Sequence, residues 1–142
     1  MTKDLSYFFK ENNNADAESQ EVFISDRFKN EEGKVIPFLV KPISTERIEE
    51  IETECTKPIL RKKRKVGEEL DKQRYVARLM VEATVYPNFK DSALLSSYGV
   101  VDPTELVKKI LHVPGEYAKL AEVVTAINGF DEDEDDVQAT KN

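Results

Sequence analysis

Residues 102–129 read DPTELVKKILHVPGEYAKLAEVVTAING, and this stretch decides the fold. Its first four residues, Asp102 to Glu105, combine a capping carboxylate, a proline at the first helical position and a glutamate three residues after the cap. Pro114 to Glu116 restarts a second helix, which Asn128-Gly129 ends. The apolar side chains recur at three- and four-residue spacing, as expected for helices with one buried face. They are Leu106, Val107, Ile110 and Leu111 in the first helix, and Tyr117, Leu120, Ala121, Val124 and Ile127 in the second.

Earlier segments carry further helix signals. Ser44 is a candidate N-cap for a helix of about 12 residues that Pro58 closes. A longer helix is expected over 68–85, with acidic side chains in its first turn, where the helix dipole favours them. Asp91 can cap a short helical turn that stops at Gly99. The apolar stripes are Ile48, Ile51 and Cys55 in the first helix, and Val76, Leu79, Met80 and Ala83 in the second.

Residues 21–43 are expected to form a β-hairpin. Apolar and other side chains alternate in two runs, separated by Asn30-Glu31-Glu32-Gly33, a turn signal with a glycine that can take positive φ. Pro37 cannot donate a ladder hydrogen bond, so the second strand is expected at a sheet edge or with its proline facing solvent. An isolated hairpin is only marginally stable, so this one must lean on the helices or pair with another chain.

The expected fold class is therefore α+β and mostly helical: an N-terminal β-hairpin followed by four to five helices. Residues 1–20 are expected to be a flexible lead, 21–130 a single domain, and 131–142 a disordered acidic tail that begins with six consecutive acids. Tyr7-Phe8-Phe9 places three aromatic side chains in the polar lead. They are expected to pack against the domain, with a short docking motif as the alternative.

Charge and composition narrow the classes of function. The chain has 142 residues, with 21 Lys+Arg against 28 Asp+Glu and a net charge of −7, and all of the excess lies in its two ends. Residues 21–127 are neutral overall. The acidic total disfavours wholesale wrapping of nucleic acid, and no apolar run approaches the roughly 18 residues of a membrane-spanning helix. A soluble intracellular protein is expected.

Residues that often carry chemistry are scarce. His112 lies near the end of a helix, where the dipole favours a cation, so a structural role is expected. Cys55 has the spacing of a core residue, and the acidic residues around it disfavour a reactive thiolate. A single cysteine also excludes an internal disulfide and a Cys-based zinc site. The sequence predicts no catalytic residue, no cofactor and no metal, and hence a protein that is not an enzyme.

The strongest local charge signal is Arg61-Lys62-Lys63-Arg64-Lys65, followed by Gly67. The preferred interpretation is a solvated basic loop that pairs loosely with acidic residues of the same chain. These are either the acidic tail or the predicted helix after Ser44, whose other face carries Glu46, Glu49, Glu50, Glu52 and Glu54. The alternative is an anion contact, which would make the chain a small nucleic-acid-binding regulatory protein, or else a localisation tag. Single-stranded nucleic acid binding usually needs stacking rings beside the charges, and no aromatic residue interleaves this run.

A series of short motifs resembles a known family. The motifs are Val85-Tyr86-Pro87-Asn88-Phe89-Lys90-Asp91, Leu94-Leu95, Ser97-Tyr98-Gly99-Val100, Leu111, Pro114-Gly115-Glu116-Tyr117 and Asn128-Gly129-Phe130-Asp131. In this order and spacing they are similar to the XkdN-like phage tail assembly chaperones of tailed phages and defective prophages of Gram-positive bacteria. The resemblance covers residues 21–131. It is weakest over 57–70, so it implies no role for the basic run.

The resemblance implies a non-enzymatic assembly factor of the host cytoplasm that is absent from the finished virion. Its partners would be the tape measure protein and the tail tube protein, with self-association left open. A free strand edge or a groove between helices could receive such a partner. The candidate partner-binding residues are Leu94, Leu95, Tyr98, Tyr117 and Phe130. For most of these residues, closing the core is the simpler role.

Overall fold

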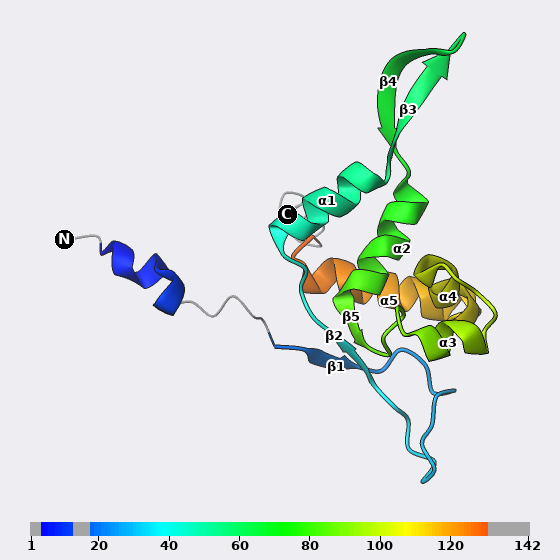
Figure 1. Cartoon of the computed structure of the whole chain (residues 1–142). Helices are drawn as coiled ribbons and strands as arrows, with labels where there is room; N and C mark the ends of the chain where they lie inside the picture. The colour runs from blue at the N-terminus through cyan, green and yellow to red at the C-terminus, as the bar shows by residue number, and fades with distance from the viewer. Residues whose placement is uncertain (1–3, 13–17, 131–142) are drawn as a thin grey trace, which may run out of the picture.

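The computed structural model describes residues 4–12 and 18–130 and shows a helical body with a small sheet (Figure 1). It confirms the α+β, mostly helical class. Two short 3-10 turns, Leu5–Phe8 and Lys10–Asn12, precede the body. The strands are β1 (Gln20–Val22), β2 (Phe38–Val40), β3 (Thr56–Arg61), β4 (Arg64–Leu70) and β5 (Thr84–Tyr86). The helices are α1 (Thr45–Glu54), α2 (Lys72–Ala83), α3 (Ser92–Ser97), α4 (Pro103–Ile110) and α5 (Pro114–Ile127).

The N-terminal β-hairpin expected over 21–43 is only partly present. β1 and β2 pair antiparallel, but each has only three residues. The segment between them contains an isolated bridge, Lys29 to Val35, with a backbone bond from Ile36 N to Phe28 O at 2.8 Å beside it. β5 pairs with the other side of β2, so the order is β1-β2-β5 and the second strand lies in the middle of its sheet. Of the two alternatives expected for this strand, the edge position is wrong. Pro37 precedes β2, is partly exposed and blocks no ladder bond within the strand.

The core forms around α2, which contacts α1, α4, α5 and β5. Leu79, Met80 and Ala83 of its predicted stripe are buried, whereas Val76 is partly exposed. Ile51 of α1 and Leu106 of α4 are fully buried in the same cluster. The stripes predicted for the helices therefore identify most of the core.

Helix starts follow the predicted caps. Ser44 Oγ accepts a hydrogen bond from Arg47 N at 3.1 Å, and Asp91 accepts one from Leu94 N at 3.0 Å. Asp102 accepts bonds from the backbone and hydroxyl of Thr104, each at 2.9 Å. These bonds satisfy N–H groups that the first turn of a helix leaves without partners.

The segment Thr56–Leu70, hereafter the arm, was predicted as a loop and the start of a helix, and it is a β-hairpin instead. Arg61 pairs with Arg64 across a two-residue turn, in which Lys62 and Lys63 have φ of 53° and 65°. Positive φ at both positions is the pattern of a type I′ turn, normally signalled by Asn-Gly. As a result, Glu68 and Glu69 lie in β4, and α2 starts later than predicted, after Asp71.

The structure describes most of the N-terminal lead but not the acidic C-terminal tail. Tyr7, Phe8 and Phe9 are 73%, 80% and 52% exposed, so these rings are not buried against the domain as expected. The predicted disordered tail, 131–142, lies outside the described residues.

Within 4–12 and 18–130, no helix is long and apolar enough to cross a membrane.

Candidate functional site

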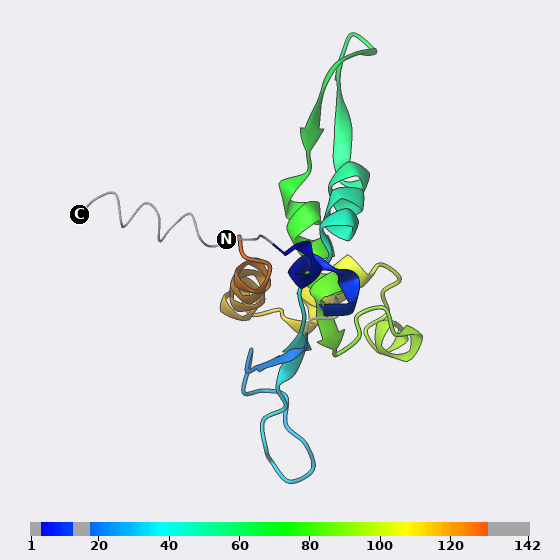
Figure 2. The ribbon, with the colours of Figure 1, turned by 90° about the vertical axis from the view of Figure 1, so that its left-hand side faces the viewer.

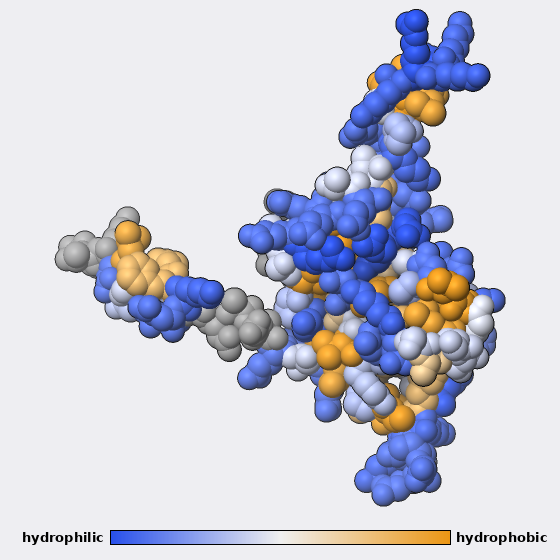
Figure 3. Space-filling model, viewed as in Figure 1, coloured by the Kyte–Doolittle hydropathy of each residue, from blue (hydrophilic) through white to orange (hydrophobic). Residues whose placement is uncertain are grey.

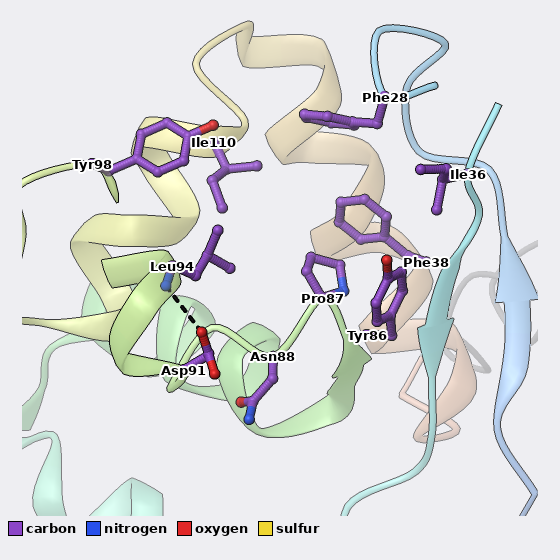
Figure 4. Close-up of a pocket in the computed structure, with 10 residues that line it drawn as sticks. All are labelled: Phe28, Ile36, Phe38, Tyr86, Pro87, Asn88, Asp91, Leu94, Tyr98 and Ile110. Atoms are coloured by element: carbon purple, nitrogen blue, oxygen red, sulfur yellow. Dashed lines mark hydrogen bonds between the residues drawn. The ribbon is translucent and has the colours of Figure 1, made fainter. Parts of the chain in front are cut away.

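An apolar groove opens between the sheet and α3 (Figure 4). It has a cavity volume of about 460 Å³. The β1–β2 connection and β2 form one wall, the chain leaving β5 forms the floor, and α3 with the end of α4 forms the other wall. Its lining residues are Phe28, Ile36, Phe38, Tyr86, Pro87, Asn88, Asp91, Leu94, Tyr98 and Ile110.

The groove combines a fixed interior with accessible rings. Phe38 is buried, and its ring lies 6.0 Å from that of Phe28 and 6.4 Å from that of the fully buried Phe89, centroid to centroid. Tyr86 and Tyr98 are 51% and 41% exposed. Tyrosine rings held at such a surface offer a large contact area at low entropic cost. The groove can therefore receive apolar side chains of a partner.

Local sequence explains how α3 presents its part of the groove. Asp91 caps the helix at Leu94, the bond drawn in Figure 4. Leu94 and Tyr98 are four residues apart and therefore lie on the same side of the helical turn. Gly99 ends the helix with φ of 67°, and the next amide, Val100 N, donates to Leu95 O at 3.1 Å. Leu95 itself packs against the core.

An ion pair anchors the wall that carries Phe28. Arg27 donates from Nε and Nη2 to the two carboxylate oxygens of Glu116, at 2.9 and 2.5 Å. Nη2 also donates to Ile110 O at 2.9 Å, and the guanidinium lies 4.8 Å from the centre of the Phe28 ring. The pair ties the β1–β2 connection to α4 and α5, so Arg27 acts as a positioning residue for the groove.

Replacing Glu116 by glutamine is expected to change how stability depends on pH. The bonds from Arg27 lower the pKa of Glu116 from its ordinary 4.5 to about 2. A lowered pKa in the folded state stabilises the protein above pH 4.5, and this contribution is lost as pH falls towards 2. As pH is lowered from 4.5 to 2, the melting temperature of Glu116→Gln should fall less steeply than that of the parent chain. Parallel curves would contradict the assignment.

The structure brings together only part of the predicted partner-binding set. Leu94 and Tyr98 line the groove. Tyr117 lies elsewhere, partly buried in a shallow surface depression beside Val76 of α2, and burial raises its pKa. Phe130 is half-exposed just beyond α5, whose C-terminal end lies away from α3 in Figure 1. These positions do not form one surface.

Sequence reasoning did not assign the rest of the groove. Phe28 and Ile36 lie on the β1–β2 connection, where Ile36 N donates to Phe28 O at 2.8 Å, whereas Ile110 comes from α4, and no local pattern joins it to them. Tyr86 and Pro87 belong to one of the family-like motifs, but they are not among the predicted partner-binding residues. The peptide bond between them is cis. The pairing of β2 with β5 brings Tyr86 beside the β1–β2 connection, and the bonds of Arg27 to Ile110 O and Glu116 bring the end of α4 there.

The basic run lies far from the groove, at the tip of the arm, which projects from the body in Figures 1 and 2. Cys55 is buried as predicted, and burial raises the pKa of its thiol. His112 is exposed and is not among the groove residues. Among the described residues, no group of three or more His, Cys, Asp or Glu side chains is placed to hold a metal ion.

Comparison with known proteins gives a consistent set of relatives. The family model for the phage XkdN-like tail assembly chaperone protein matches residues 5–141. YqbN of Bacillus subtilis (strain 168), an uncharacterized protein, is 49% identical over 98% of this chain and 93% of its own. XkdN of the phage-like element PBSX in the same organism is 44% identical, over 95% and 90% of the two chains. A crystal structure of YqbN matches with a TM-score of 0.79 and 44% identity, covering 92% of this chain and 100% of its own.

Proposed function

The chain belongs to the phage XkdN-like tail assembly chaperone family, and we propose that it is a non-enzymatic chaperone whose apolar groove binds the tape measure protein, tail tube subunits or both. It acts inside the host cell while the tail is assembled and is absent from the finished virion. Binding is stoichiometric and needs no cofactor.

The observation that carries the groove's role is the exposure of its rings. An exposed apolar surface lowers the solubility of a protein unless a partner covers it. Exposed apolar patches therefore commonly mark interaction sites. Tyr86 and Tyr98 remain accessible above the buried Phe38 ring, and Asn88 and Asp91 supply polar groups at the rim. An apolar centre with a polar rim is the usual anatomy of a protein interface.

The shape of the groove favours one kind of client segment. An amphipathic helix places apolar side chains at i, i+3, i+4 and i+7, and such a row lies along a groove between secondary-structure elements. The tape measure protein, as the family resemblance implies, is long and helical and would offer such rows repeatedly. We therefore place the tape measure protein first among the clients.

Co-expression tests the proposal. The tape measure protein encoded beside this chain should be more soluble in its presence and should co-purify with it. The physical reason is that the groove covers apolar side chains that would otherwise aggregate. The matched control co-expresses the tape measure protein with an unrelated acidic protein of similar size. The proposal fails if the tape measure protein stays insoluble and unbound while this chain is folded.

A further inference from the structure

The arm stands apart from the rest of the chain. In the described chain, β3 and β4 contact each other more extensively than any other pair of elements does. Leu60 and Val66 are 63% and 59% exposed near the tip. Figure 3 shows a hydrophilic tip with a hydrophobic patch directly below it. A two-stranded hairpin that leaves apolar side chains exposed gains little free energy when it folds by itself. Exposed apolar side chains commonly mark interaction sites, so we infer that the arm contacts a partner.

The tip carries a concentrated positive charge. Arg61 to Lys65 are five consecutive cationic residues, all exposed. Among ion pairs with described residues, only Lys65 of these five has a partner, Glu68, at 2.6 Å. None of the ion pairs between described residues joins an acid of α1 to the tip, and α1 lies at the base of the arm (Figure 1). The tip therefore fits an anionic segment with several charges in a row.

We propose that the basic tip of one copy binds the acidic run 131–136 of a second copy. This run has six consecutive Asp and Glu residues, opposite in sign to the five cationic residues of the tip and, like them, contiguous along the chain. Every copy supplies both partners at equal concentration. Because tip and run are different surfaces, the contact is heterologous and links copies head to tail.

Chain length argues for a second copy rather than for the run of the same chain. Asn128 Oδ1 accepts a bond from Ile43 N at 2.7 Å, so α5 ends where α1 begins. From there, the ten residues of α1 span about 15 Å and the six residues of β3 about 20 Å, on the way to the tip. Fully extended, the eight residues from Asn128 to Asp136 reach only about 26–29 Å. Within one chain, only the end of the run could approach the tip, whereas all six acids can meet the tip of another copy.

A protein segment fits the tip better than nucleic acid does. The whole chain carries a net charge of −7, which opposes the approach of a polyanion to any part of it other than the tip. The arm also contains no aromatic residue on which bases could stack. Nucleic acid binding at the tip is accordingly the rival outcome that the experiment must separate.

Two variants of the full-length chain test the contact. The tip variant carries Arg61→Gln, Lys62→Asn, Lys63→Gly and Arg64→Gln, in which Asn-Gly suits the type I′ turn and preserves the arm. The tail variant replaces each acid of 131–136 by its amide. A charge-matched control replaces four exposed lysines outside the arm, Lys29, Lys34, Lys108 and Lys119, by glutamine.

Sedimentation velocity at low ionic strength is the measurement. The parent chain and the control should associate as concentration rises, with a Kd that increases at least about tenfold when screening shortens the Debye length from roughly 30 to 8 Å. Each variant alone should be monomeric. Their equimolar mixture should form a 1:1 dimer that grows no further, because only one tip and one acidic run remain intact.

Three results would overturn the proposal. They are a parent chain that stays monomeric at low ionic strength, a mixture of the two variants that forms no dimer, or a tail variant that still associates. Nucleic acid binding, the rival outcome, is tested by adding a labelled oligonucleotide to the tail variant. Binding that depends on the tip and persists at a Debye length of about 8 Å would assign the tip to nucleic acid instead. None of these results depends on whether the groove binds the tape measure protein.

Discussion

Replacing Phe89 by alanine is expected to lower the free energy of unfolding by about 3–5 kcal/mol, the usual cost of deleting a buried aromatic ring. Phe89 is fully buried, and its ring meets that of Phe38 at an interplanar angle of 61°. It therefore supports the interior of the groove from below. The loss combines the transfer free energy of the ring with the cavity that it leaves.

Urea unfolding followed by circular dichroism checks this effect. The matched control is Phe23→Ala, because Phe23 is an exposed phenylalanine and its removal should change stability by no more than about 0.5 kcal/mol. If Phe89→Ala cost as little as the control, the ring would not be part of the core, and the interior of the groove would be wrongly described.

Replacing both Tyr86 and Tyr98 by alanine is expected to weaken binding to a helical segment of the tape measure protein by about 2–4 kcal/mol, or roughly 30- to 1000-fold in Kd. Tyrosines at the centre of an interface commonly contribute the largest share of the binding free energy. Both rings are half-exposed in the free chain, so their removal should leave the melting temperature nearly unchanged. Isothermal titration gives the Kd.

The control for this pair is Phe130→Ala. Phe130 is also a half-exposed aromatic residue of the family-like motifs, but it lies beyond α5 and away from the groove. The variant should bind as the parent chain does. If Phe130→Ala weakened binding as much as the tyrosine pair did, the client would use a different surface.

Local signals allowed the helices to be predicted but not the arm. Asp91 and Asp102 cap their helices as expected, because a capping carboxylate acts on amides two or three residues away. The arm has no regular apolar alternation, and its turn uses Lys62-Lys63, which normally avoid positive φ. A strongly charged run without such alternation is typical of a loop, and the sequence therefore predicts a loop there.

The groove was predictable only in small part, for a different reason. Leu94 and the C-cap residue Tyr98 are four positions apart, on successive turns of one helix face, and could be grouped from their spacing. Phe28 and Ile110 are 82 positions apart and meet only after the β1–β2 connection is tied to α4 and α5. Arg27 makes that tie through Glu116, and no sequence pattern pairs residues at this separation.

Amide chemical shifts test the central claim most directly. When a soluble helical fragment of the tape measure protein is titrated into the labelled chain, the largest shifts should cluster at the groove, around Phe38, Tyr86, Leu94 and Tyr98. Amides of the arm and those around Tyr117 should move little. Saturable shifts centred on the arm or on Tyr117, with the groove unperturbed, would contradict the account.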